Sequence, residues 1–180
     1  MTLKRPFIYV GSYVSDEDAA RHPAFSQAAN LYQAKFIDFA QPSDVITLVP
    51  FFVTDARTFS SPRPIKFVCH SAPWLPRFLQ RFWRWFADTV VACVYVSRTR
   101  GRDVFFYNLD KQNLFLAALV RFLLCRRVYV IVADYMRYDS RMLQAVFDWF
   151  TRRTQGTLVL NSNIRCHPNR RVMPGLLYED

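Results

Sequence analysis

The feature that most constrains the fold is a strand–helix–strand pattern over residues 103–135. Asp103–Asn108 and Arg127–Ala133 are short, mostly apolar runs, and the second is rich in β-branched residues. Strands that are apolar on both faces are typical of a parallel sheet covered by helices. Residues 114–122 between them show helical periodicity and supply the crossover that two parallel strands require. The pattern therefore predicts an α/β fold.

The same alternation extends over the rest of the chain. Further strands are predicted at residues 6–11, 44–52, 65–70, 157–161 and 171–174, and further helices at 23–39, 73–96 and 139–153. A Ser- and Pro-rich loop at 56–64 joins the second and third strands, and the acidic run 16–18 is expected to be a solvated loop. This order predicts a doubly wound, mostly parallel sheet with helices on both faces, in a single domain spanning residues 1–180.

The charge of the chain predicts an anionic partner. The formal net charge is +10, which suits nucleic acid, anionic lipid or a phosphorylated substrate. The longest apolar run, Thr89–Val96, is far shorter than the ~20 residues of a membrane span, and the N-terminus has no signal-peptide pattern. A soluble or peripheral, cytoplasmic protein is therefore predicted. The four cysteines lack paired metal-ligand spacing, so we expect free, buried thiols and no metal.

Residues at the ends of the predicted strands are the candidates for ligand binding. Ligands of open α/β sheets bind beyond the carboxyl ends of the strands. The candidate substrate-binding residues at these ends are Gly11, Ser12, Tyr13, His70, Asn108, Asp134 and Tyr135. The first strand is followed by one glycine and not by G-x-G-x-x-G, and no P-loop is present, so we expect no nucleotide cofactor.

Three of these candidates each have two interpretations. Gly11 either lets a ligand approach the backbone or forms a plain tight turn. His70 either has a functional role, in which it contacts a sugar or phosphate or acts as a base, or is structural. Asp134 either faces the site or caps the following loop.

Residues 73–88 have the most unusual composition in the chain. On a helix, Arg77, Arg81 and Arg84 share one side with Gln80, and five apolar residues share the other. Such a helix can cover the sheet with its arginines in water, lie on a membrane surface, or enter a nucleic-acid groove. The candidate membrane contacts are Trp74, Arg77, Phe78, Arg81, Phe82 and Trp85.

Four segments together resemble the N-terminal Rossmann-like domain of family-4 glycosyltransferases with the GT-B architecture. They are Ile8–Gly11 before an Ala-rich helix, Lys66–His70 before a Pro-Trp-Leu helix, Phe105–Asn108 before an apolar helix, and Val130–Asp134. The closing stretch, from Asn161 to Val172–Gly175, is similar to the passage into the second domain of such enzymes.

The resemblance implies the acceptor-binding half of an enzyme whose second, sugar-nucleotide-binding domain is absent from this sequence. It places Gly11 and Ser12 along the cleft and Asn108 and Asp134 on the acceptor side. The resemblance implies three partners. They are a lipid-linked or saccharide acceptor, the anionic inner face of a membrane, and a separate donor-binding domain or chain. The chain would be an excised N-terminal domain or one subunit of a split enzyme, as in the two-chain N-acetylglucosaminyltransferase of the dolichol pathway.

Two other functions remain open from the residues alone. A non-enzymatic basic α/β domain that binds nucleic acid or serves as an adaptor would use the same charge, although no RNA-recognition or helix-turn-helix pattern is present. A small complete enzyme could use Asp134 and His70 as acid and base.

Overall fold

A computed structural model describes residues 6–22, 26–50, 53, 59, 64–99, 103–133, 140–159 and the backbone of 170–172. Seven strands form one sheet, and every described pair of neighbouring strands is parallel. They are β1 (Phe7–Gly11), β2 (Asp44–Leu48), β3 (Ile65–Val68), β4 (Asp103–Tyr107), β5 (Arg127–Val132), β6 (Gly156–Val159) and β7 (Arg170–Val172). The helices are α1 (Asp16–Arg21), α2 (Gln27–Ala40), α3 (Arg77–Arg98), α4 (Lys111–Phe122) and α5 (Arg141–Thr151).

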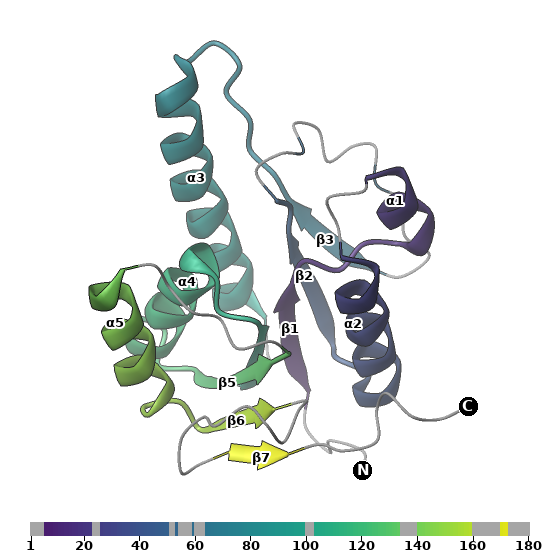
Figure 1. Cartoon of the computed structure of the whole chain (residues 1–180), viewed down its shortest axis with the longest axis vertical. Coiled ribbons are helices and arrows are strands. Elements are labelled where there is room, and N and C mark those ends of the chain that lie inside the picture. The colour runs from purple at the N-terminus through teal and green to yellow at the C-terminus, as the bar shows by residue number, and fades with distance from the viewer. Residues whose placement is uncertain are drawn as a thin grey trace.

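The strand order is β3-β2-β1-β4-β5-β6-β7, which is the order of a doubly wound, Rossmann-like sheet. Helices α3, α4 and α5 lie on one side of the sheet, and α1 and α2 lie on the other (Figure 1). The predicted α/β fold, with a parallel sheet and helices on both faces, is therefore confirmed.

Alternate residues of the central strands supply two separate cores. Ile8 and Val10 of β1 pack with Ala92 of α3 and Leu116 of α4 on one face. On the other face, Phe7 and Tyr9 pack with Tyr32 and Phe36 of α2 and with Phe105 of β4. Because side chains alternate along a strand, β1 contributes to both cores and all five of its residues are buried.

Four helices begin at capping residues that the sequence carries at the right places. Ser15, Ser26, Asp110 and Ser140 each accept a hydrogen bond from the backbone N–H three residues later, which satisfies one of the free donors of the first turn. Pro76 precedes α3, where its missing N–H removes no helical hydrogen bond.

Several local expectations are wrong. Residues 16–18 are not a solvated loop: they open α1, with Ser15 as its N-cap, and Asp18 is buried. Cys125 is exposed and Cys69 and Cys93 are half-buried, so the thiols are less buried than expected. Residues 54–58, 60–63 and Cys166 lie outside the described residues.

Gly11 is required by packing within the domain. A Cβ at this position would meet the Gln33 side-chain oxygen and would lie 2.8 Å from the Tyr9 ring. Both neighbours are buried, so neither can move away without disturbing the core. Gly11 is therefore needed for the close approach of α2 to β1, and the approach of a ligand to its backbone stays a prediction.

We expect Gly11→Ala to lower the free energy of unfolding by about 1–3 kcal/mol because it overpacks this contact. Gly156→Ala is the matched control, since a Cβ there would make only an ordinary contact with Tyr129 at 3.4 Å. Urea unfolding of both variants measures the difference. Equal stability of the two variants would contradict the packing role of Gly11.

Candidate functional site at the switch point of the sheet

The chain changes direction across the sheet between β1 and β4. From β1 it passes to α1 and α2 on one side, and from β4 it passes to α4 on the other side (Figure 1). The loops after two such strands diverge, and the crevice between them is where open α/β sheets bind ligands. The fold alone therefore makes this point the place to look for a site.

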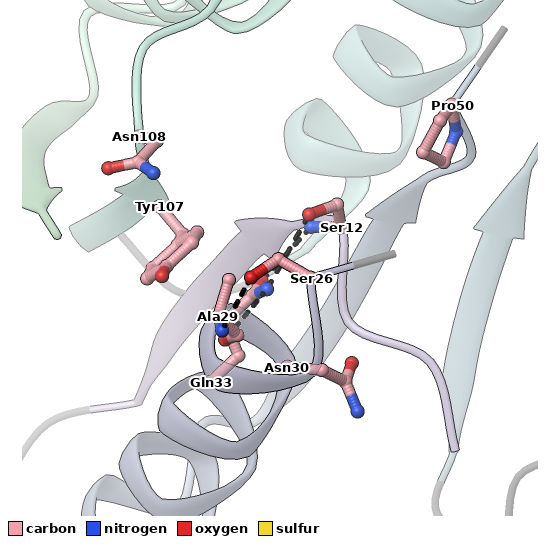
Figure 2. A pocket seen from close by; sticks show the side chains of 8 residues that line it. All are labelled: Ser12, Ser26, Ala29, Asn30, Gln33, Pro50, Tyr107 and Asn108. Atoms are coloured by element: carbon pink, nitrogen blue, oxygen red, sulfur yellow. Dashed lines mark hydrogen bonds between the residues drawn. The ribbon is translucent and has the colours of Figure 1, made fainter. Parts of the chain in front are cut away.

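A pocket of about 150 Å³ lies at this switch point (Figure 2). Its walls come from the carboxyl ends of β1, β2 and β4 and from the first turns of α2. The lining residues are Ser12, Ser26, Ala29, Asn30, Gln33, Pro50, Tyr107 and Asn108. In Figure 2, Tyr107 and Asn108 stand across the pocket from Ser12 and Pro50.

Two buried amides on α2 hold the loop that follows β1. The Gln33 side-chain oxygen accepts hydrogen bonds from the Tyr9 hydroxyl at 3.0 Å and from the Ser12 backbone N–H at 3.1 Å. Asn30 Oδ1 accepts from the Val14 N–H at 3.0 Å. These bonds satisfy backbone donors that the loop would otherwise bury unpaired, and they fix one wall of the pocket.

Asn108 fixes the opposite wall. Its Oδ1 accepts a hydrogen bond from the Ala133 N–H at 2.9 Å, and its own N–H donates to the Ile131 carbonyl at 2.8 Å. Asn113 of α4 donates to the Asn108 carbonyl at 3.0 Å. The backbone of Asn108 has a φ of 45°, a left-handed conformation that asparagine tolerates better than most residues. The tips of β4 and β5 are thus held together around this side chain.

The pocket is polar and carries no formal charge on its eight lining residues. Its groups are hydroxyls and amides, beside one alanine and one proline. Tyr107 stacks on the buried Tyr32 ring with centroids 5.9 Å apart. Burial raises the pKa of Tyr32 to about 12. The pKa of Tyr9 is raised well above its usual range, mainly by burial and to a lesser extent by the nearby Tyr107 and Tyr32. Tyr9 and Tyr32 are therefore neutral at physiological pH.

A second polar group lies at the same edge of the sheet, beyond β3. The buried Asp88 of α3 accepts a hydrogen bond from the His70 backbone N–H at 2.8 Å, and His70 Nδ1 lies 2.8 Å from the same oxygen. The imidazole is partly exposed. The carboxylate orients the ring and leaves Nε2 as its other polar atom.

Arg84 connects this group to the pocket wall. Its guanidinium is buried and lies 3.4 Å from the Asp88 carboxylate. It also donates hydrogen bonds to three backbone carbonyls, those of Val49 at 2.8 Å, Pro50 at 3.0 Å and Val53. The loop after β2, which carries Pro50 into the pocket, is therefore held by a buried cation.

The predicted site residues have different places in the structure. Ser12 and Asn108 line the pocket, and Gly11 packs against Gln33 and Tyr9. Tyr13 is buried in the core, where its carbonyl accepts from the Thr47 hydroxyl at 2.7 Å. His70 lies two residues after the end of β3 and does not line the pocket. Asp134 and Tyr135 lie outside the described residues.

Six of the lining residues are not among those predicted from the sequence, and Asn30 and Gln33 are the most informative of them. Both are polar positions on the buried side of an otherwise apolar helix face. A buried amide in an amphipathic stripe needs a hydrogen-bond partner, and this signal points to the loop that they hold.

The predicted amphipathic segment is mostly exposed. Trp74, Phe78 and Phe82 are exposed by 76%, 75% and 65%, Arg77 and Arg81 are also exposed, and Trp85 is half-buried. Arg84, which was grouped with the outward-facing arginines, instead points into the protein. No helix within the described residues is long and apolar enough to cross a bilayer, and these residues contain no group of three or more potential metal ligands.

No family model matches the chain, and no curated protein matches it significantly. The chain is similar to the crystal structure of a UGT transferase from Siraitia grosvenorii in complex with UDP, with 14% identity and a TM-score of 0.46. The similarity covers 85% of this chain and 44% of that one, so the chain spans less than half of that structure. The family-4 assignment stays a prediction.

We expect Arg84→Met to lower the free energy of unfolding by about 3 kcal/mol or more, because it leaves Asp88 buried without its cation. Arg81→Met, one turn earlier and exposed, is the matched control and should change stability by less than about 0.5 kcal/mol. Urea unfolding measures both. A loss below about 1 kcal/mol for Arg84→Met would show that the buried ion pair is not what holds the loop.

The burial of the tyrosines should make the stability of the protein depend on pH in the alkaline range. Tyr32 has a pKa near 10 in the unfolded state and about 12 in the folded state. Below pH 10 this difference stabilises the fold in full, and the contribution is lost as the pH rises through the folded value. We therefore expect the free energy of unfolding to fall between pH 10 and 12.

Tyr32→Phe tests the assignment. The Tyr32 hydroxyl has no hydrogen-bond partner among the described residues, so the variant should be at least as stable as the wild type at pH 7. It should also lose less stability at alkaline pH. Identical alkaline slopes for the two proteins would show that Tyr32 ionises in the folded state as readily as in the unfolded one.

Proposed function

We propose that this chain is the acceptor-binding, membrane-facing half of a glycosyltransferase of polysaccharide or glycolipid assembly, and that transfer requires a separate donor-binding domain or chain. The observation that carries the proposal is the uncharged polar pocket at the switch point of the sheet. It lies where Rossmann-like domains bind ligands, and its chemistry suits a sugar.

The pocket offers the groups that sugar hydroxyls require. A saccharide presents several hydroxyls, each of which can donate and accept, and the amides and hydroxyls of the pocket can do both. A phosphate would be better served by a cation, and none of the eight lining residues is charged. We therefore assign the pocket to a neutral saccharide unit.

The size of the pocket fits half of a binding cleft. Complete ligand pockets usually enclose about 300–1,000 Å³, whereas this one encloses about 150 Å³. It is large enough for part of a ligand, and the rest would contact a second module. A reacting hydroxyl of the acceptor would project from the pocket toward that module.

The chain's own contribution to transfer is to bind and orient the acceptor. Gln33 and Asn108 hold opposite walls of the pocket through backbone hydrogen bonds, so the walls are arranged before a ligand arrives. Such preorganisation lowers the entropy lost when the reacting groups meet. The transferred sugar would come from an activated donor held by the second module.

The exposed start of α3 supports a membrane-facing placement, peripheral to the inner face. Trp74, Phe78 and Phe82 are exposed beside Arg77 and Arg81. Aromatic rings next to arginines are typical of helices that lie at an anionic membrane surface. A lipid-linked acceptor would then meet the pocket from the membrane to which this helix binds.

We expect methyl glycosides to bind the pocket and Ala29→Leu to weaken that binding by about tenfold or more, a loss of about 1.4 kcal/mol. The larger side chain would fill the pocket at a position that lines it. Ala28→Leu, on an exposed neighbouring position of α2, is the matched control and should bind as the wild type does. NMR titration with a panel of neutral methyl glycosides measures the affinities.

Two results would overturn the saccharide assignment. One is that no glycoside in the panel shifts the resonances of Ser12, Gln33 and Asn108. The other is tight, steeply salt-dependent binding of oligonucleotides in the absence of glycoside binding, which would favour the nucleic-acid alternative.

A further inference from the structure

The exposed hydrophobic surface of this protein is concentrated on one side. Among the described residues, sixteen large hydrophobic side chains are exposed, and only Leu31 and Phe39 belong to α2. The other fourteen lie on α3, α4 and α5 or within three residues of their ends. The outer face of helices that cover a sheet is normally polar, so the exposed apolar side chains indicate an interaction surface on this side of the protein.

The surface continues well beyond the start of α3. Trp85 of α3 packs against Phe115 of α4 at 4.7 Å, and Phe122 of α4 packs against Trp149 of α5 at 5.7 Å. These contacts join the three helices, which lie together on one side of the sheet (Figure 1). At the far end they form what we call the α4–α5 patch, which consists of Phe122, Leu123, Met142, Val146 and Trp149.

The charges on this side are almost all positive. The acidic residues of α3, α4 and α5 and their N-caps are Asp88, which is buried, Asp110, which caps α4, and Asp148, which is half-buried and accepts from Gln144 at 3.1 Å. Arg153, just after α5, places its guanidinium 4.3 Å from the Trp149 ring centroid. The remaining basic residues of these helices are Arg77, Arg81, Arg84, Arg98, Lys111, Arg121 and Arg141, of which Arg84 is buried. The face is therefore both apolar and cationic.

We propose that the whole outer face of α3, α4 and α5 lies on an anionic lipid bilayer, with the α4–α5 patch as a second contact beside the start of α3. This inference rests on the membrane contact in the proposed function and extends it to two further helices. Helix α3 alone is about 33 Å long at 1.5 Å per residue. Contacts near both ends of such a face fix the orientation of the protein on the membrane.

Charge and side-chain type favour lipid over other occupants. A second copy of this chain would bring the same positive face against itself, which is unfavourable. Nucleic acid matches the charge but offers no environment for Leu123, Met142 and Val146. Anionic lipid satisfies both, since the cations meet the headgroups and the apolar side chains enter the interface.

The test compares single acidic substitutions that change the net charge equally. Leu123→Asp and Met142→Glu alter the α4–α5 patch at side chains exposed by 70% and 77%, where folding should be preserved. Phe78→Asp alters the start of α3, and Phe39→Asp on α2 is the control on the other side of the sheet. Sedimentation with vesicles of phosphatidylcholine and phosphatidylglycerol measures partitioning, with pure phosphatidylcholine vesicles as the neutral reference.

We expect wild-type protein to prefer the anionic vesicles, and Leu123→Asp, Met142→Glu and Phe78→Asp each to lower partitioning by about tenfold, with Phe39→Asp unchanged. Loss of binding in Phe78→Asp alone would overturn this inference and leave the proposed contact of α3 standing. Failure of the wild type to bind would overturn both. Unchanged vesicle binding together with a loss of self-association in Leu123→Asp and Met142→Glu would instead assign the patch to a contact between copies.

Discussion

The structure depends on the parallel pairing of β1 with β2 on one side and β4 on the other. This pairing buries all five residues of β1 and makes it part of both cores. It also sets the loops after β1 and β4 on opposite faces of the sheet, which opens the crevice between them. The candidate site is therefore a consequence of topology, and the side chains around it determine what it can bind.

Buried polar groups convert that crevice into a defined pocket. Gln33 and Asn30 hold the loop after β1, Asn108 joins the tips of β4 and β5, and Arg84 holds the loop after β2. Each connects segments far apart in the chain, and each would be costly to bury without its partners. The polar network thus supports the walls, while the uncharged groups that remain around the pocket suit a saccharide.

The basic, aromatic face of α3, α4 and α5 lies on the other side of the sheet from α2 (Figure 1), so one layer would bind the membrane and the other would help to form the acceptor pocket.

Local patterns in the sequence predicted most of the strands, the parallel sheet and two pocket residues, Ser12 and Asn108, because strand ends can be located from the apolar runs. They did not predict what depends on tertiary contacts. Arg84 shares a helical side with Arg77 and Arg81, yet α3 packs on the sheet at that turn and buries it. Asp18 belongs to an acidic run that looks solvated, but Ser15 caps a helix there. The α4–α5 patch was also missed, since the apolar residues of α4 and α5 are indistinguishable in sequence from those that face the core.

NMR of the ¹⁵N-labelled protein on lipid nanodiscs, with and without a lipid-linked saccharide, most directly tests whether the pocket binds a membrane-borne acceptor. We expect plain anionic nanodiscs to perturb resonances of α3, α4 and α5. Adding the lipid-linked saccharide should further shift those of Ser12, Gln33 and Asn108, which lie around the switch-point pocket. Identical spectra on the two kinds of nanodisc across a panel of saccharides, with the pocket resonances unmoved, would contradict the claim that this pocket binds a membrane-borne acceptor.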